Sequence, residues 1–533
     1  MQKAKWREED SLFAAVALPD VLEARDRRAA KRSDLLSEAG YCLLSVSLLM
    51  PGPIKTSKLS RAFLREYCAY LRKQLRGQNL LPVREEALVD PAGDAYFFLF
   101  TSGTDPLFLK KLLISMEEEY DWSRVLDLDL YLYGSDPVSR VRLQQPERRC
   151  LICSEEAHAC SRSQKHSTGD LQEIVRQFQT DGLLQLLCSR MQAAALSAAV
   201  SELLVAPKPG LVTGSDAGSH DDMDRFSYAD SIAALAGYFQ TAARCGLQVA
   251  LFRDSAPEQG SEEDCYMEFH KRLAELKQEG LKAERRMLAA TGGVNTHKGF
   301  IYLSGLVLAA AASLSMDPLP LAASLDVEDE TGLIEGWQQQ ISRWALALQD
   351  IHNLYPQPGE TAGESIRRRY GISGVRGEAA GGIGSVFQLG LPFYRGLKER
   401  AMAENEAAAV TLLLILAATE DTTLIKRAGL QEAERIRQGL AEFFHTMAQT
   451  GGQCPGQLPD DSTVDKQAAV NKEQLAADAL SPPCLDNIAR GETAVISYIS
   501  LWSDYFREKT YSAGGAADLL AICLLVLKLL ADI

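Results

Sequence analysis

Residues 167–170 read Ser-Thr-Gly-Asp and stand directly before a long segment with helical spacing. A Ser or Asp in front of periodic apolar residues is typical of a helix start, because its side-chain oxygen can accept a hydrogen bond from a free backbone N–H. The pattern predicts a helix over residues 168–205. Strand and helix patterns are mixed before this start, whereas helical spacing dominates after it. We therefore expect two structural parts that meet here.

After this start, almost every periodic segment up to Ile533 has helical spacing, and no alternating run competes as a strand. Residues 451–486 are rich in Gly, Pro, Asp and Gln, which indicates a surface loop. The second part is therefore predicted to be all-α, with functional residues in the loops between helices. Helices are expected at about 168–205, 227–245, 262–290, 299–314, 331–351, 383–403, 405–419, 430–449 and 513–531.

The residues before this start mix strand and helix patterns. A short apolar run at 42–49 ends at Pro-Gly-Pro, which is typical of a strand entering a loop. The fold class predicted for the chain is multidomain, with an α+β domain at residues 1–170 and a larger all-α domain at residues 171–533. Within the first domain we also expect strands at 96–100 and 125–133 and helices at 57–75 and 106–120.

Length and composition agree with this division. A chain of 533 residues is too long for one ordinary core. The net charge of -15 argues against nucleic acid as a partner. Eleven cysteines and the lack of a secretory signal at the first residues favour a reduced, cytoplasmic chain. The apolar runs 300–314 and 518–530 are shorter than the ~20 residues of a membrane span, so we interpret both as buried helices and expect no membrane contact.

Asp127 and Asp129 stand two residues apart in the expected strand 125–133. Alternate residues of a strand point to the same face, so both carboxylates could hold one Mg²⁺ ion. An amphipathic strand that turns its acids toward water has the same spacing. Spacing alone leaves both interpretations open.

Basic residues near the N-terminus could bind phosphate groups. Arg25, Arg27, Arg28 and Lys31 cluster on an expected helix, and Lys55 follows the Pro-Gly-Pro turn. Each of them could instead be a solvated surface cation.

Cys150, Cys153, Cys160 and His166 have a spacing that is compatible with a zinc site. A single Cys-x-x-Cys pair with one further Cys is a weaker signal than two such pairs. The alternative is a group of reduced thiols packed at the domain edge.

Glycines and cations crowd into several loops of the second part. Lys208, Lys298 and Arg376 each stand beside Gly or Pro turns, which suits phosphate binding. Gly292 and Gly293 would let backbone N–H groups approach phosphate oxygens at the start of the next helix. The spacing is not that of a Walker loop.

Acids accompany these cations. Asp221, Asp222 and Asp224 follow His220 in one loop, and Glu420 and Asp421 end an apolar helical run. Carboxylates beside an apolar helix are costly unless they are paired or bound to metal, so Glu420 or Asp421 could act as a general base, and Asp421 with the aspartates near 222 could hold Mg²⁺. Ordinary structural roles remain open, including a cap by Asp518 for the last helix.

These strings resemble those of the triphosphoribosyl-dephospho-CoA synthase family of the citrate lyase system, over roughly the last two thirds of the chain. The resemblance rests on residues 207–212 (Pro-Lys-Pro-Gly-Leu-Val), 218–224, 291–298, 361–364 (Thr-Ala-Gly-Glu), 374–379, 420–422 (Glu-Asp-Thr) and 514–520. The chain departs from the family pattern at Thr423, where Asn is usual, and at 512–516, where Ser-Pro-Gly-Gly-Ser is usual.

The first third is similar to another family, the citrate lyase holo-acyl-carrier-protein synthases, or phosphoribosyl-dephospho-CoA transferases. The supporting strings are 24–28 (Ala-Arg-Asp-Arg-Arg), 51–55 (Pro-Gly-Pro-Ile-Lys), 126–129 (Leu-Asp-Leu-Asp) and the cysteine segment at 148–166. Leu49 and Met50 stand where this family usually has Asn-Ile. The whole chain thus resembles a fusion of two consecutive enzymes.

The resemblance implies a bifunctional transferase with a nucleotidyltransferase-type first domain. Its second domain would join ATP to 3′-dephospho-CoA and release adenine. Its first domain would then transfer the product to a serine of the citrate lyase acyl carrier protein, the gamma subunit, and release pyrophosphate. Mg²⁺ at Asp127 and Asp129 is part of this expectation. The open alternatives are the same chemistry for the malonate decarboxylase carrier protein, or a helical nucleotide- or CoA-binding protein without turnover.

Overall fold

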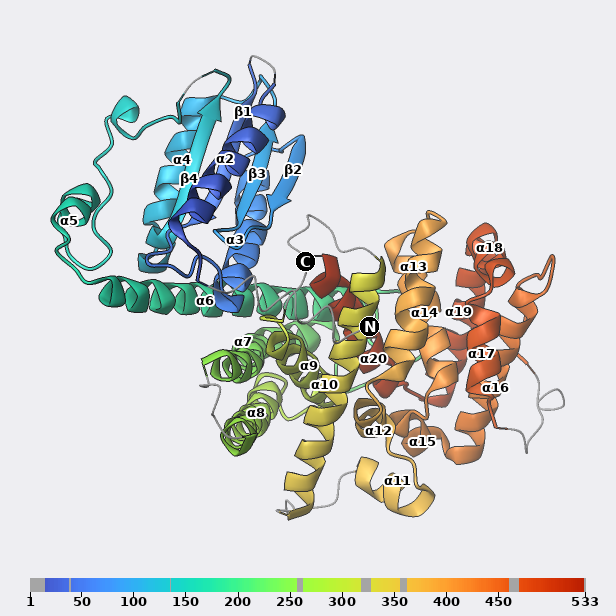
Figure 1. Ribbon diagram of the computed structural model, residues 1–533. Helices are drawn as coiled ribbons and strands as arrows, with labels where there is room; N and C mark the ends of the chain where they lie inside the picture. The colour runs from blue at the N-terminus through green and yellow to red at the C-terminus, as the bar shows by residue number, and fades with distance from the viewer. Residues whose placement is uncertain are drawn as a thin grey trace.

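The computed structural model describes residues 15–37, 40–134, 136–255, 262–317, 327–354, 362–459 and 469–531. It has the two expected parts, a mixed α/β part followed by a helical part (Figure 1). The first part contains one four-stranded antiparallel sheet in the order β2-β3-β1-β4. Its strands are β1 (Cys42–Leu48), β2 (Arg84–Leu88), β3 (Ala95–Phe100) and β4 (Leu126–Leu132).

The two faces of the sheet are covered differently. Alternate residues such as Leu44 and Leu128 face a large core formed with α3 (Lys58–Gly77) and α4 (Pro106–Glu118). The opposite residues, such as Leu43 and Phe97, meet a small separate core at the end of α2 (Leu18–Leu35). The α2 face therefore has room for polar groups beyond this small core.

The 37-residue helix α6 (Thr168–Leu204) joins the two parts. It packs against α3 and η1 (Asp121–Val125) at one end and against α7 and α20 at the other (Figure 1). Arg190 of α6 forms an ion pair with Glu66 of α3, with 2.8 Å between Nε and Oε2. The two parts are thus braced against each other along one helix.

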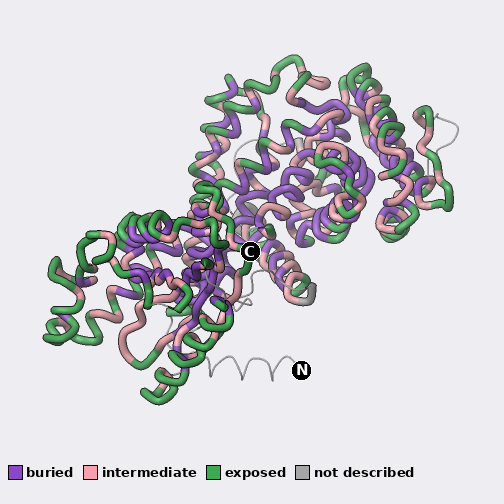
Figure 2. The backbone as a smooth tube through the Cα atoms, turned by 90° about the horizontal axis from the view of Figure 1, so that it is seen from above, coloured by how far each residue is buried: buried purple, intermediate pink, exposed green. Residues whose placement is uncertain are grey.

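The helical part is built around apolar helices. Buried residues fill its middle, and exposed residues lie on its outside (Figure 2). The remaining elements are η2 (Val141–Leu143), α5 (Ala157–Ser163), α7 (Arg225–Ser255), α8 (Glu262–Ala290), α9 (Lys298–Ser313), α10 (Val327–Leu354), α11 (Ala362–Tyr370), α12 (Gly374–Ala380), η3 (Ser385–Gly390, a π-helix), α13 (Leu391–Glu399), α14 (Glu404–Ala418), α15 (Thr422–Ala428), α16 (Leu430–Ala448), α17 (Lys472–Ala479), α18 (Pro482–Arg490), α19 (Glu492–Lys509) and α20 (Gly514–Ala531).

Within the described residues two helices, α6 and α20, are long and apolar enough to cross a membrane, and α14 with α15 could form a third, bent span. In this fold α20 is surrounded by α6, α9 and α14. Its apolar side chains from Leu519 to Val526 are buried against them. This agrees with the interpretation of 518–530 as a core helix.

Most expected elements are present, and the exceptions have local causes. Strand β2 reads Arg-Glu-Glu-Ala-Leu and lies at the sheet edge, so it carries no apolar alternation. The loop expected over 451–486 is wrong for α17 and α18, which start at the capping residues Asn471 and Ser481. Residues 460–468 of that loop lie outside the described residues. The boundary placed at residue 170 stays a prediction, and it falls in the first turn of α6.

Candidate functional site

The acid pair of the first part lies on one face of β4. Asp127 stands opposite Ser47 and Asp129 opposite Ser45 in the β1–β4 ladder. The alternating residues Leu126, Leu128 and Leu130 are buried while both aspartates are half-buried, so the expected common orientation is confirmed. This is the face on which α2 lies.

Asp127 lies near one other carboxylate and two cationic side chains, which have opposite effects on its pKa. Burial and the neighbouring carboxylate of Asp129 raise the pKa of Asp127, although Arg148 and Lys110 act in the opposite direction. The Arg148 guanidinium lies 3.2 Å from the Asp127 carboxylate, Nη2 to Oδ1. Two close carboxylates whose repulsion shifts a pKa are a donor set that fits a divalent cation.

Part of the predicted basic cluster comes together beside this face. Burial and the charge of Arg25 lower the pKa of Lys55, whose Nζ donates to the Met50 carbonyl at 2.7 Å. Arg28 donates to the Gly93 carbonyl at 2.9 Å and is also influenced by the charge of Arg25. The other two cations of the cluster are ion-paired within the protein, Arg27 with Asp90 and Lys31 with Glu86. Arg25, Arg28 and Lys55 are therefore the residues placed to meet an anion.

A cavity of about 700 Å³ lies in the helical part. The first turn of α9 and the first turn of α20 both line it, together with loops that precede α7 and α12. Predicted residues in its wall are Asp222, Lys298 and Arg376, joined by His220. The structure thus brings segments that are almost 300 residues apart in sequence, from His220 to Gly514, to one place.

One end of this cavity is acidic. Asp518 of α20 is half-buried, and its carboxylate accepts a hydrogen bond from the backbone N–H of Phe300 in α9. Burial, together with the charges of Glu202 and Asp421, raises the pKa of Asp518 well above its usual range. Glu202, at the end of α6, is held by the buried ammonium of Lys208 at 2.5 Å. Two carboxyl groups with different partners therefore share this end.

Gly299 makes room for Asp518. A Cβ on Gly299 would lie 1.9 Å from Oδ2 of Asp518, well inside van der Waals contact. The absence of a side chain at this position is thus what allows the carboxyl group to reach the start of α9.

The other walls carry cations. Lys298 is paired with Glu284, and Arg376 with Glu364 at 3.1 Å. Arg427 donates to Nδ1 of His220 at 3.2 Å, and Nε2 of His220 lies 3.1 Å from Oγ of Ser512. Burial and the Arg427 charge lower the pKa of His220, so the ring is neutral near pH 7. Lys277, Arg367 and Lys426 add to the cationic lining.

His297 precedes α9 and is fully buried beside Tyr228. Its Nδ1 lies 2.7 Å from Oγ of Ser231, while Nε2 is buried without a hydrogen-bond partner. Burial and the charge of Lys208 lower its pKa from 6.5 to about 3. The ring is therefore neutral in the folded protein.

This predicts a pH-dependent stability. The unfolded chain binds a proton at His297 below its unfolded pKa of 6.5, but the folded chain does so only near 3. The His297 contribution is complete above pH 6.5 and is lost as the pH falls, at about 1.4 kcal/mol per unit. Between pH 7 and pH 5 the free energy of unfolding of the wild type should fall by about 2 kcal/mol more than that of His297→Gln, as measured by urea unfolding. An equal pH slope for both proteins would contradict the buried, neutral assignment.

Several residues that were predicted to bind phosphate do not line the main cavity. Lys208 does not line the cavity, because its ammonium binds Glu202. Gly292 and Gly293 adopt positive φ angles in the turn before α9 but do not line the cavity either. The structure therefore places none of these three residues in the cavity wall, where direct phosphate contact was predicted.

The acidic set predicted to hold Mg²⁺ in the helical part does not fit the ion. Asp224 accepts hydrogen bonds from the N–H groups of Phe226 and Ser227 at the start of α7. Asp421 accepts from Thr423 and Leu424 of α15 through Oδ1, and from Ala516 of α20 through Oδ2. The oxygens of Asp421 are therefore used to tie two helix starts together.

Glu420 and Asp421 line a smaller pocket of about 300 Å³, next to the larger one. Glu420 is exposed there, and burial raises the pKa of Asp421 although its backbone hydrogen bonds act against this. Asp221 lies in neither pocket, so only Asp222 of the predicted acidic loop reaches the main cavity.

Glu202 and Asp518 are the site residues that the sequence interpretation missed. A signal for both existed. Asp518 is the one acid within the apolar helix 514–531, and Glu202 is the one acid between residues 182 and 215. A lone acid in an apolar helix is costly unless it has a purpose.

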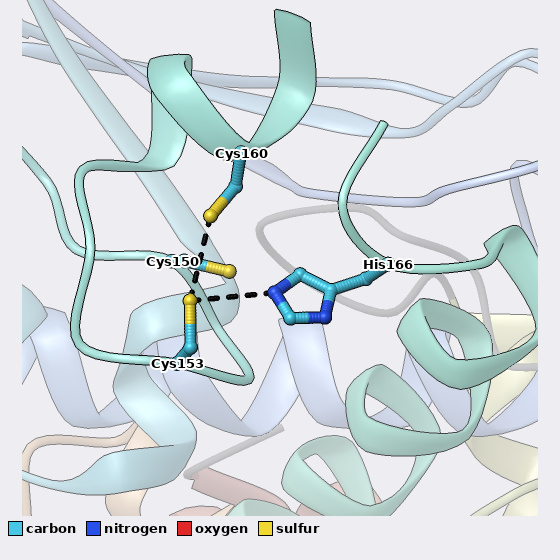
Figure 3. Close-up of side chains that lie close together, drawn as sticks. All are labelled: Cys150, Cys153, Cys160 and His166. Carbon is cyan, nitrogen blue, oxygen red and sulfur yellow. Dashed lines mark hydrogen bonds between the residues drawn. The ribbon is translucent and has the colours of Figure 1, made fainter. Parts of the chain in front are cut away.

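The predicted cysteine cluster is compact (Figure 3). One ligand atom from each of Cys150, Cys153, Cys160 and His166 lies within 4.8 Å of all the others. The Cys153 sulfur lies 3.4 Å from that of Cys160 and 3.3 Å from Nε2 of His166. In the described ranges, no other group of three or more His, Cys, Asp or Glu side chains is this close.

Comparison with known families gives two matches that divide the chain within α6. Residues 16–181 match apo-citrate lyase phosphoribosyl-dephospho-CoA transferase, and residues 188–482 match ATP:dephospho-CoA triphosphoribosyl transferase. The first match includes Asp127 and the cysteine cluster. The second match includes Lys298 and Arg376 of the main cavity, whereas Asp518 lies beyond it.

Curated relatives show the same division. The chain is 31% identical to Protein CitXG of Leuconostoc mesenteroides subsp. cremoris over 443 residues, which cover 82% of this chain and 88% of that protein. It is 27% identical to Protein CitXG of Haemophilus influenzae over 515 residues, which cover 96% of each. A probable 2-(5''-triphosphoribosyl)-3'-dephosphocoenzyme-A synthase of Vibrio cholerae is 33% identical over 236 residues, or 44% of this chain and 68% of that protein.

Proposed function

We propose a division of two reactions between the two parts of the molecule, from the premise that this chain belongs to the family that joins an apo-citrate lyase phosphoribosyl-dephospho-CoA transferase to an ATP:dephospho-CoA triphosphoribosyl transferase. The chain is a bifunctional transferase of citrate lyase prosthetic-group synthesis. It makes 2′-(5″-triphosphoribosyl)-3′-dephospho-CoA from ATP and 3′-dephospho-CoA, and it attaches this group to the acyl carrier protein of citrate lyase.

The synthase reaction belongs to the main cavity of the helical part. The observation that carries this assignment is the Asp518 carboxyl group, which has a raised pKa and lies at the start of α9, opposite a cationic wall. In the structure Lys298 and Arg376 pair with glutamates, which a triphosphate would replace as partners. The positive end of the helix dipole at the start of the 16-residue helix α9 adds a further attraction for phosphate oxygens.

Two carboxyl groups supply the proton transfers. Adenine leaves the ribose through an oxocarbenium-like state and must gain a proton, while the 2′-hydroxyl of dephospho-CoA must lose one. Asp518 has a raised pKa and gives its proton to the departing base. Glu202, which is ion-paired with Lys208, takes the hydroxyl proton as the new C–O bond forms. One proton is donated and one accepted, so the reaction is balanced.

The transfer reaction belongs to the α2 face of the sheet, which would make the first part a nucleotidyltransferase-type domain. Asp127 and Asp129 fit a Mg²⁺ ion, which would neutralise phosphate charge and favour departure of pyrophosphate. Arg25, Arg28 and Lys55 bind the polyphosphate and hold it in line for attack by the carrier serine. The carrier protein of citrate lyase is the direct partner in this proposal, and the location is cytoplasmic.

Two readouts on one reaction mixture test the proposal. The full chain is incubated with ATP, dephospho-CoA, Mg²⁺ and apo carrier protein; adenine is measured by chromatography and the carrier by mass spectrometry. Adenine should appear without the carrier, and the carrier should gain mass only when both substrates are present. The malonate decarboxylase carrier serves as the comparison acceptor. Carrier modification without adenine release would contradict the proposed order.

Gly299→Ala should impair the synthase reaction alone. The added Cβ would overlap the Asp518 carboxyl group, which must then leave the start of α9. We expect adenine release to fall about tenfold or more, as for a misplaced catalytic group. Transfer of pre-made intermediate to the carrier should be unchanged.

Gly237→Ala is the matched control, because a Cβ there meets no atom within 4 Å. It lies on α7, outside the cavity wall, and should leave both reactions unaffected. Normal adenine release by folded Gly299→Ala would contradict the position assigned to Asp518.

A further inference from the structure

A four-ligand group of the first part takes no direct part in the chemistry proposed for either reaction. Three sulfurs and one imidazole nitrogen converge from Cys150, Cys153, Cys160 and His166 (Figure 3). Zinc bound tetrahedrally, with Zn–S near 2.3 Å and Zn–N near 2.0 Å, requires neighbouring ligand atoms about 3.5–3.8 Å apart. The distances of 3.4 Å between the Cys153 and Cys160 sulfurs and 3.3 Å from Cys153 to His166 are close to this requirement.

The segment that carries these ligands has almost no core of its own. Between residues 148 and 166, only Cys150 and Cys160 are buried. Regular structure is limited to the seven-residue helix α5 and the isolated bridge between Arg149 and Glu156. Little apolar burial is available to hold this segment, so a bound metal would supply what a core supplies elsewhere.

The same segment carries a cation of the transfer site. Arg148, two residues before Cys150, contacts Glu117, the Leu126 carbonyl at 3.0 Å and the carboxylate of Asp127 at 3.2 Å. The Arg148 carbonyl in turn accepts from the N–H of Ala157, at the start of the helix that bears Cys160. The position of Arg148 therefore depends on the fold of the cysteine segment.

We propose that Cys150, Cys153, Cys160 and His166 bind one structural Zn²⁺ ion, and that this ion positions Arg148 against Asp127 in the transfer site. Four protein ligands close the coordination sphere, so the ion binds no substrate. Binding releases the three thiol protons to solvent and leaves three thiolates and one neutral imidazole on the metal. Arg148 acts as a positioning residue for the Asp127 carboxylate.

The zinc content of the purified protein tests directly whether the four residues bind the metal. The full chain, purified without chelator, should contain close to one zinc per chain by plasma mass spectrometry, and Cys153→Ser should contain less than a tenth of that. Cys265→Ser is the matched control, since Cys265 lies on α8 away from the cluster, and it should keep the wild-type zinc. Zinc-free wild type, or full zinc in Cys153→Ser, would overturn the proposal.

Cobalt provides a second measurement that does not depend on a variant that folds. Co²⁺ added to metal-free wild-type chain should give the intense visible bands of a tetrahedral site with thiolate ligands. Zinc should displace them at one equivalent. Octahedral Co²⁺ spectra would contradict the four-ligand site.

The coupling to Arg148 is tested by both reactions. Removal of zinc should lower the rate of carrier modification from pre-made intermediate at least tenfold, and added zinc should restore this rate. The rate of adenine release should stay within twofold of that of the zinc-loaded protein. In zinc-free protein, Arg148→Ala should cause no further loss of carrier modification. In zinc-loaded protein, the same substitution should lower carrier modification. Equal loss of both reactions on zinc removal, or an Arg148→Ala effect that does not depend on zinc, would overturn the positioning role.

Discussion

Asp518→Asn should nearly abolish adenine release, with a decrease of about 100-fold to 10,000-fold. The asparagine amide has the same shape and can still accept from the Phe300 N–H, but it cannot give a proton to departing adenine. Initial rates of adenine formation from ATP and dephospho-CoA measure the effect. Transfer of pre-made intermediate to the carrier should remain at the wild-type rate, because it takes place on the sheet.

The pH dependence gives the same prediction an independent test. The pKa of Asp518 is raised well above its usual range, and the protonated form is the active one in our mechanism. Adenine release should therefore decline as the pH rises through this raised pKa, and Asp518→Asn should lack that decline. Asp504→Asn, on the exposed side of α19, is the control and should behave as wild type. A wild-type rate for Asp518→Asn would remove this residue from the mechanism.

Asp127→Asn should have the reverse effect, with carrier modification reduced at least 100-fold and adenine release unchanged. The substitution keeps the shape but removes one of the two charges that fit Mg²⁺. A 100-fold loss corresponds to about 2.7 kcal/mol of transition-state stabilisation, which is within the several kcal/mol that a metal supplies. The rate of carrier mass gain with pre-made intermediate, as a function of Mg²⁺ concentration, measures it.

Stability separates a lost site from a lost fold. Removing one of two repelling carboxylates should leave the free energy of unfolding of Asp127→Asn unchanged or slightly higher. Asp181→Asn, an exposed change on α6, controls for a simple loss of negative charge. Full transfer activity in folded Asp127→Asn would mean that the acid pair is only the solvated side of an amphipathic strand.

Local patterns in the sequence predicted those parts of the site that a single element contains. The alternation in β4 was enough to place Asp127 and Asp129 on one face, because a strand has a period of two. The cysteine spacing predicted a cluster because its ligands lie within 17 residues of one another. The two-part architecture followed from the change of periodicity at the start of α6.

Features that depend on distant partners could not be predicted in this way. Asp421 was expected to bind metal, but its oxygens accept from the start of α20, almost 100 residues later. Lys208 was expected to bind phosphate, but it neutralises Glu202. Asp518 depends on the space left by Gly299, and only the packing of α20 against α9 reveals this.

The loop residues nevertheless identified the right region. The strings near 220, 297 and 376 converge on the main cavity, although their individual roles differ from those expected. Glycines, cations and acids in loops between apolar helices indicate a site, whereas which of them touches the substrate is set by tertiary contacts.

The central claim is that one chain contains two independent sites, and mixing the two inactive variants tests it most directly. Asp518→Asn supplies an intact transfer site, and Asp127→Asn supplies an intact synthase cavity. Carrier protein incubated with both variants, ATP, dephospho-CoA and Mg²⁺ should gain the mass of the prosthetic group, while neither variant alone modifies it. Unmodified carrier in the mixture, with both variants folded and pre-made intermediate still accepted by Asp518→Asn, would contradict the account.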